Sequence, residues 1–194
     1  MEYYHSSADR AALTAESDER LAQRALTDDR AFEILVERYE QRLRRYVVRL
    51  IRCSAEDAED VVQEVFINAY RNLNGFDANL KFSSWLYRIA HNAAVSHVRR
   101  VAARPTVRME DELFDTLASE LNMEHDLGRK IEDAQVRAAI DRLDPKYRDV
   151  LVLRYLEDRD YGEISDILQK PLGSVSSLIT RAKKLLSNEI ESKT

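Results

Sequence analysis

The chain has 194 residues, of which 34% are charged and 44% hydrophobic, with only 4 Gly and 3 Pro; this composition favours an all-α protein over a turn-rich β-sandwich. No apolar run is long enough to span a membrane, and the polar first residues are unlike a signal peptide, so we expect a cytoplasmic protein without membrane insertion. The net charge of -5 argues against a nucleic-acid partner unless the basic residues are segregated from the acidic ones.

Periodicity predicts a first helical domain over residues 17–102, after a mobile tail at residues 1–16. A short helix near residues 18–25 is expected to precede two long ones. The first begins after Thr27, a reasonable N-cap, and the second after Ser54, which resembles a capping box with the acid three residues later. The apolar stripes of these two long helices predict an antiparallel hairpin.

A third helix is expected after a polar loop, with Ser83 or Ser84 as its N-cap. Residues 74–100 interleave aromatic and amide side chains with cations. Aromatic rings offer stacking platforms for unpaired bases, amides can read base edges, and cations can hold the backbone, so single-stranded DNA is a candidate ligand. The alternative for Phe82 and Trp85 is that both rings simply belong to the core.

Residues 56–64 carry five acids and no base. A solvated helix face and a docking surface for a basic protein are both open interpretations. A catalytic carboxylate pair is disfavoured, because no His, Lys or nucleophile is patterned around these acids. Cys53 is alone, the four His are scattered, and no phosphate-binding loop occurs, so we expect neither an enzyme nor a cofactor or metal site.

A linker is expected over residues 103–129, where a Pro-containing and then acidic segment breaks the periodicity, and a second domain over residues 130–190. Within that domain, an Asp-Pro pair opens one helix, and Asp160 with Glu163 forms a capping box for a short helix. The turn at residues 169–173 then leads into a final helix. This order of short helix, tight turn and longer helix is typical of a helix-turn-helix.

Small hydroxyl residues begin the final helix and cations follow them. A recognition helix places its N-terminal side chains on base edges and its cations on phosphates, so the pattern predicts duplex DNA binding. The alternative is an ordinary solvated helical hairpin. The candidate residues are Ser174, Ser176, Ser177, Thr180, Arg181, Lys183 and Lys184.

Four motifs occur in order along the chain: DAEDVVQEVFINAYRNLNGFD at residues 57–77, KFSSWLYRIAHNAAVSHVRR at residues 81–100, LDPKYRDVLVLRYLEDRDYGEISDIL at residues 143–168 and PLGSVSSLITRAKKLL at residues 171–186. Together they resemble the extracytoplasmic-function sigma factors, a compact two-domain branch of the bacterial sigma family. The resemblance implies a region 2 helical bundle and a region 4 helix-turn-helix joined by a flexible linker.

The resemblance also implies partners. The acidic helix would dock on the clamp coiled coil of the largest subunit of core RNA polymerase, through Asp57, Asp60, Gln63 and Glu64. The second domain would sit on the polymerase flap and bind the minus-thirty-five element as duplex. The acidic linker would thread towards the active-site cleft, and family members are commonly held inactive by an anti-sigma factor.

The resemblance further implies that the loop and third helix capture the minus-ten element as a melted single strand, with the chemistry left to the polymerase. The residues implied are Asn74, Phe76, Asp77, Lys81, Phe82, Ser84, Trp85, Arg88, Asn92, Arg99 and Arg100. One departure concerns the final helix, because family members often carry Arg or Lys where this chain has Ser176, Ser177 and Leu178. Fewer direct base contacts would leave more of the recognition to DNA shape.

A rival hypothesis is a helix-turn-helix regulator that binds duplex DNA without being a polymerase subunit. It explains the last 50 or so residues. It does not explain why residues 78–109 lack any acid while being rich in cations, aromatic rings and amides.

Overall fold

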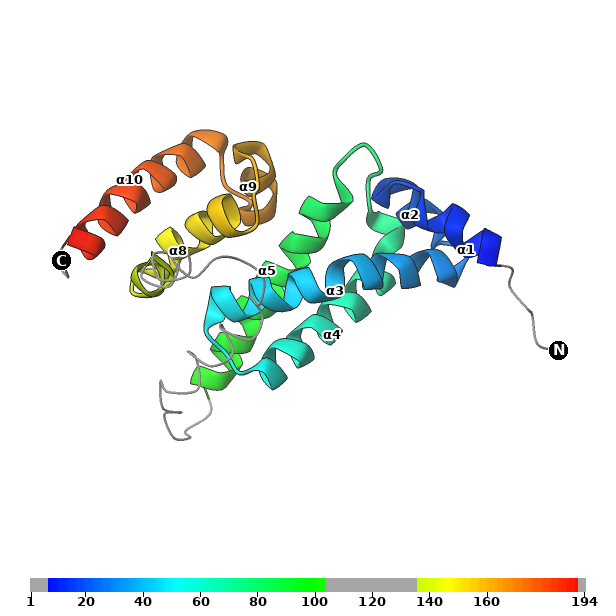
Figure 1. Cartoon of the computed structure of the whole chain (residues 1–194), viewed down its shortest axis with the longest axis horizontal. Helices are drawn as coiled ribbons and strands as arrows, with labels where there is room; N and C mark the ends of the chain where they lie inside the picture. The colour runs from blue at the N-terminus through cyan, green and yellow to red at the C-terminus, as the bar shows by residue number, and fades with distance from the viewer. Residues whose placement is uncertain (1–6, 104–135, 192–194) are drawn as a thin grey trace.

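The computed structural model describes residues 7–103 and 136–191. The described residues form helices joined by turns and loops, with no strand among them, which confirms the all-α prediction. The first group of helices forms a bundle, with α3, α4 and α5 packed on one another and α1 and α2 at one end (Figure 1). Its elements are α1 (Ser7–Thr14), α2 (Asp18–Arg24), α3 (Asp29–Ile51), α4 (Ala55–Arg71), the short 3-10 turn η1 (Leu73–Gly75) and α5 (Phe82–Ala102).

The long helices begin at local caps. The side chain of Asp28, one residue after the expected Thr27, accepts the Arg30 N–H and starts α3. Ser54 caps α4 as expected by accepting the Asp57 N–H at 3.0 Å. Apolar residues recur at helical spacing along both helices, and these residues are buried on the faces turned towards the core.

Helix α1 lies where the sequence predicted a mobile tail over residues 1–16. Among residues 9–14 of this helix, Leu13 is the one that is buried in the core, at 2% exposure. The Arg38 guanidinium of α3 adds to this by donating to the Thr14 carbonyl oxygen. One buried Leu and contacts to another helix leave no periodic pattern in the segment itself, so this helix could not be predicted from its sequence. Residues 1–6 lie outside the described residues.

The expected cap of the third helix is wrong. Helix α5 begins at Phe82, so Ser83 and Ser84 lie inside its first turn, and Ser84 is buried at 4% exposure. The residue at the cap position, Lys81, makes no side-chain hydrogen bond to the helix. The acceptor comes instead from α2, where the Glu19 carboxylate accepts the Phe82 N–H at 3.1 Å.

The second group of helices follows residues 136–141, which are helical, and forms the expected helix-turn-helix. The capping box is confirmed, because Asp160 accepts the Glu163 N–H at 2.8 Å and Glu163 accepts the Asp160 N–H at 2.9 Å. Gln169, with φ 53°, makes the left-handed turn that ends the short helix. The elements are α8 (Pro145–Leu151), the π-helix η2 (Val152–Leu156), α9 (Tyr161–Leu168) and α10 (Leu172–Glu191).

The two groups of helices pack against each other, with α9 in contact with α5 and η2 in contact with α3. Leu153 and Ile164 of the second group belong to the same buried cluster as Tyr46 and Leu86 of the first. The predicted linker over residues 103–129 falls almost wholly outside the described residues. No described helix combines the length and the apolar character that a membrane crossing needs.

Candidate protein and nucleic-acid interfaces

The four residues expected to dock on polymerase lie along one side of α4. Asp60 and Gln63 are exposed, while Asp57 and Glu64 are half-buried. The spacing of three and four residues brings them onto neighbouring turns of one helix face. The structure therefore gathers all four into one acidic strip on the outer surface of the bundle.

The acidic strip adjoins the C-terminal end of α5. His97 Nε2 lies 3.6 Å from Asp57 Oδ1, and Arg100 Nη2 lies 2.8 Å from Glu64 Oε2. Arg100 was expected to contact DNA and Glu64 to contact polymerase, so the two candidate surfaces meet at this ion pair. The Arg100 side chain is 56% exposed and that of Glu64 39%, so water screens the pair and it contributes little to stability.

The aromatic residues of the candidate strand site form a cluster beneath the loop. Phe82 is fully buried and Trp85 is 9% exposed, and their ring centroids lie 5.6 Å apart. Phe76 is half-buried and packs 5.4 Å from each of them. The alternative that Phe82 and Trp85 belong to the core is thus what the structure shows, and Ser84 lies buried beside them.

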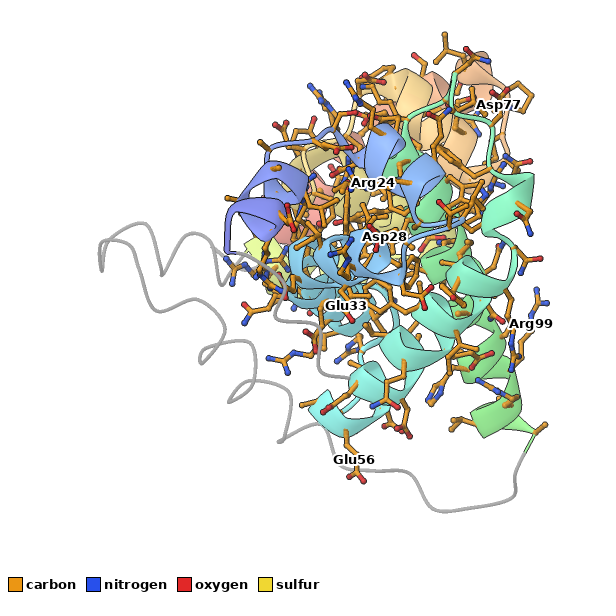
Figure 2. All side chains as sticks on the ribbon, turned by 90° about the vertical axis from the view of Figure 1, so that its right-hand side faces the viewer. Arg24, Asp28, Glu33, Glu56, Asp77 and Arg99 are labelled. Carbon is orange, nitrogen blue, oxygen red and sulfur yellow. The ribbon has the colours of Figure 1, made fainter. Side chains whose placement is uncertain are left out.

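The accessible part of the same site is polar and basic. Asp77 accepts hydrogen bonds from the backbone N–H and the side-chain amide of Asn79, both at 2.9 Å, which shapes the loop. Figure 2 shows Asp77 on the loop between α4 and α5, and Arg99 projecting outward from α5. The exposed candidate residues are Asn74, Asp77, Lys81, Asn92, Arg99 and Arg100, and Arg88 is half-buried.

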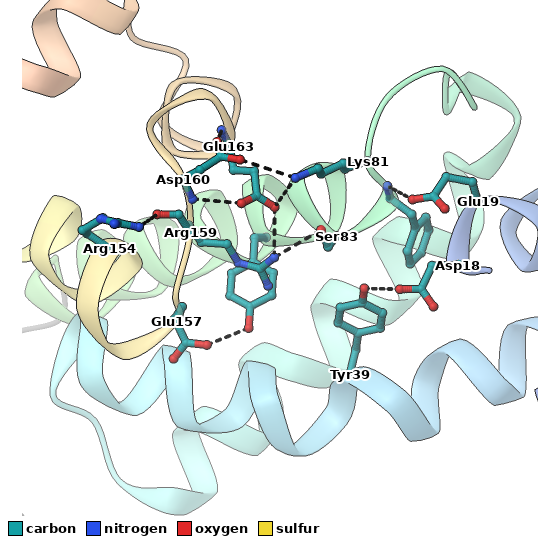
Figure 3. A network of polar contacts seen from close by, with 12 residues as sticks. Asp18, Glu19, Tyr39, Lys81, Ser83, Arg154, Glu157, Arg159, Asp160 and Glu163 are labelled. Atoms are coloured by element: carbon teal, nitrogen blue, oxygen red, sulfur yellow. Dashed lines mark hydrogen bonds and ion pairs between the residues drawn. The ribbon is translucent and has the colours of Figure 1, made fainter.

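Lys81 is turned towards the second group of helices. Its Nζ lies 3.3 Å from Glu163 and 3.5 Å from Asp160 (Figure 3). The hydrogen bond to Glu163, together with its charge, raises the pKa of Lys81. In this arrangement a cation expected to hold DNA backbone is occupied by two carboxylates of the helix-turn-helix.

A polar network between the two groups was not predicted from the sequence. The Arg159 guanidinium, on the turn before α9, lies over the Tyr87 ring with its central carbon 4.2 Å from the ring centroid. It also donates to Ser83 Oγ at 3.2 Å and to Glu163 at 3.3 Å (Figure 3). Arg159 is only 6% exposed, so the network is part of the packed contact.

The other end of this network is Glu157. Its carboxylate accepts a hydrogen bond from the Tyr87 hydroxyl at 2.8 Å and one from Arg49 at 3.1 Å. Burial, with the nearby Glu157 charge, raises the pKa of Tyr87 to about 12, so the hydroxyl stays protonated and donates. Each of these charged residues looks like part of a solvated turn or helix in the sequence, which is why the network was missed.

The residues expected to read duplex DNA are all exposed on α10. Ser177 donates to the Gly173 carbonyl oxygen at 2.9 Å and Thr180 to that of Ser176 at 3.0 Å, so these hydroxyls offer acceptor lone pairs outward. Lys183 is drawn aside, with its Nζ 5.6 Å from the Tyr155 ring centroid.

An open groove of about 820 Å³ lies where α9 turns into α10. Lys170, Ser174, Ser177 and Arg181 are among its lining residues. Two cations and two hydroxyls at this helix start can contact phosphates and base edges of a duplex. Within residues 7–103 and 136–191, no cluster of His, Cys, Asp and Glu could hold a metal ion.

Two family models match the chain. Residues 35–104 match Sigma-70 region 2, and residues 133–186 match Sigma-70, region 4. The first match covers most of α3 and all of α4 and α5, and the second covers the helix-turn-helix.

Several curated proteins are similar over most of their length. The RNA polymerase sigma-H factor of Pseudomonas aeruginosa is 36% identical, with 92% of this chain and 96% of that protein aligned. The ECF RNA polymerase sigma factor SigW of Bacillus subtilis is 33% identical, over 88% of this chain and 95% of that protein. The ECF RNA polymerase sigma-E factor of Escherichia coli K12 is 34% identical, over 84% and 88%.

Known structures agree with this. CnrH, solved in complex with the cytosolic domain of CnrY, has a TM-score of 0.67 and 26% identity, covering 92% of this chain and all of that one. The sigma factor RpoE of Bartonella quintana, solved with the anti-sigma factor NepR, shares the fold with a TM-score of 0.63 at 18% identity, over 82% and 96% of the two chains.

Proposed function

The chain belongs to the extracytoplasmic-function branch of the sigma-70 family, and from this premise we propose how its surfaces divide the work of a sigma factor that directs RNA polymerase to promoters. Region 2 is the first group of helices and region 4 the second. The observation that carries the proposal is that the two regions expose three surfaces, each with the chemistry its partner needs. Region 2 has an acidic strip on α4 and a basic and amide-rich surface around α5, and region 4 has the hydroxyl- and cation-bearing α10.

Docking on core polymerase is assigned to the acidic strip. Asp60 and Gln63 point into solvent, and Asp57 and Glu64 flank them. A carboxylate strip fits a basic protein surface and repels DNA, which supports the partner that the family resemblance implies, the clamp coiled coil of the largest subunit. Region 4 would bind the flap of the same polymerase.

Recognition of the melted minus-ten strand is assigned to the loop and α5. The exposed amides and cations of this surface can contact base edges and backbone, and Phe76, half-buried, lies nearest the surface among the clustered rings. Phe82, Ser84 and Trp85 support the loop from below. Because such a site binds only separated strands, it lowers the free energy of the open complex relative to the duplex, and melting then needs no ATP.

Recognition of the minus-thirty-five element is assigned to α10. Ser174, Ser177 and Arg181 share the groove at its start, and Lys184 lies one turn beyond Arg181 on the same side. The side chain positions suit duplex reading in the major groove. The domain limits at residues 17–102 and 130–190 and the threading of the acidic linker remain part of this proposal.

The packed arrangement of regions 2 and 4 points to a resting form. Lys81 is occupied by region 4, and the network around Arg159 is buried between the regions. Relatives of this fold were solved with CnrY and with the anti-sigma factor NepR. We infer that this chain also has an anti-sigma partner, and that it acts in the cytoplasm beside its polymerase without catalytic residues of its own.

Reconstituted transcription tests the proposal. Core polymerase with this chain should start RNA synthesis at defined sites in a library of genomic fragments, whereas core alone should not. Asp60→Lys should lower the affinity for core about tenfold or more, because it places a cation against a basic surface. Glu33→Lys, the same charge change at an exposed position of α3, is the matched control and should bind normally. Equal affinities for the two variants would contradict the docking assignment.

A further inference from the structure

Helix α5 starts without a cap of its own. Lys81 at the cap position makes no side-chain hydrogen bond to the start of the helix, and the first turn of the helix carries no acid. The first N–H groups of a helix lack intrahelical acceptors and carry a partial positive charge, so an acceptor there stabilises the helix start. The start of α5 is also the end of the loop that the proposed function assigns to the melted strand.

The missing acceptor is supplied by α2. Glu19 lies 63 residues before Phe82 and is half-buried, and its carboxylate accepts the Phe82 N–H at 3.1 Å. Figure 3 shows Glu19 reaching from α2 to the point where the loop enters α5. A charged acceptor on a helix start is stronger than a neutral one, so this bond ties the loop to the N-terminal helix.

A second connection runs from α2 to the same place. Asp18 accepts hydrogen bonds from the Tyr39 hydroxyl and from Arg38. The Tyr39 ring in turn meets Phe82 edge-on, with centroids 5.9 Å apart. Phe82 is the ring on which Phe76 of the loop packs. Both acids of α2 therefore act on Phe82, one at its backbone and one through its side chain.

We propose that Glu19 is a positioning residue for recognition of the melted strand, acting by holding the start of α5 and the loop before it. The proposal rests on the proposed function of that loop. Residues 76–81 contain no regular element and are held at their far end by η1. Without Glu19 the loop would have to be ordered when the strand binds, and that ordering would oppose binding.

An opposite role for the same carboxylate is conceivable in chemical terms. An anion on a helix start can occupy the place where a DNA phosphate would bind, and its removal would then strengthen strand binding. The contacts favour positioning, because within the described residues Glu19 accepts one N–H, that of Phe82, and its neighbour Asp18 holds the ring cluster through Tyr39. The two roles predict shifts of opposite sign.

The experiment uses holoenzyme assembled from core polymerase and the full chain. The probe is the single-stranded oligonucleotide that unaltered holoenzyme selects from a randomised pool, labelled for fluorescence anisotropy. Glu19→Ala should weaken binding of this probe about threefold to tenfold, the range expected for losing a helix cap. Glu19→Gln keeps a neutral acceptor and should recover most of the affinity. Affinity for core polymerase should be unchanged for both.

The matched control is Glu16→Ala. Glu16 is another Glu of the same segment, so replacing it changes the net charge by as much as Glu19→Ala does. It pairs with Arg24 at 3.0 Å. It should leave probe binding within about twofold of the unaltered chain. Unchanged or tighter binding by Glu19→Ala, with unaltered holoenzyme still selecting a strand, would overturn the inference alone. Failure of unaltered holoenzyme to select any strand would instead overturn the proposed function.

Discussion

Replacing Tyr87 with Phe removes one hydroxyl from the contact between regions 2 and 4 and retains the ring. The hydroxyl donates to Glu157 at 2.8 Å, and the side chain of Glu157 is 6% exposed. The ring still lies under the Arg159 guanidinium. The variant therefore isolates a single hydrogen bond to a buried carboxylate.

The loss of stability depends on the hydrogen bonds that Glu157 keeps in the variant. Hydrogen bonds to charged groups contribute about 1.5–3 kcal/mol, and a buried charge left without a partner costs more. Here Arg49 still donates to Glu157 at 3.1 Å, so the carboxylate keeps a charged hydrogen-bond partner. We expect the free energy of unfolding to fall by about 1.5–2 kcal/mol, at the lower end of that range.

The assay is urea denaturation followed by circular dichroism, as a double-mutant cycle with Glu157→Gln. In the Glu157→Gln background the acceptor is neutral, so Tyr87→Phe should cost less than half as much as in the unaltered chain. The fluorescence of Trp85, the single Trp, reports region 2 separately. An equal cost of Tyr87→Phe in both backgrounds would refute the idea that this bond joins the two regions.

Three further outcomes are expected. Burial raises the pKa of Asp149 to about 6, so the protonated carboxyl contributes its full stability below the usual pKa of 3.8, and this contribution is lost as the pH rises through 6. Asp149→Asn should therefore raise the free energy of unfolding by about 2–3 kcal/mol in urea melts at pH 7. An equal gain at pH 4 would contradict this. Arg181→Ala should weaken holoenzyme binding to minus-thirty-five duplex by about 1–3 kcal/mol in filter binding, and no change would exclude its role. Leu13→Ala should cost about 2–3 kcal/mol and release α1 to amide exchange; protection as in the unaltered chain would show that Leu13 is not its anchor.

Local rules were sufficient for most helix limits. The capping box of Asp160 and Glu163 and the cap at Ser54 depend on residues three apart, which a sequence shows directly. The expected cap at Ser83 or Ser84 failed because the true acceptor, Glu19, is remote in sequence. Such a contact depends on tertiary packing and leaves no short-range pattern.

The candidate site likewise contains features that local sequence predicts and features that depend on tertiary packing. The acidic strip on α4 and the cations of α10 were predictable, because charge and helical spacing place them on a surface. The aromatic residues were ambiguous, since a ring at a core position and a ring that stacks on a base have the same pattern; Phe82 proved to be fully buried. The network around Arg159 could not be predicted, because a charged turn is normally solvated.

The central claim is that this chain, bound to core polymerase, favours separated strands over paired ones. Permanganate footprinting of holoenzyme on a start site found by reconstituted transcription measures this directly. Thymines just upstream of the start should become reactive without ATP when this chain is present, and remain unreactive with core alone. Transcription from such sites with every thymine protected would contradict the account.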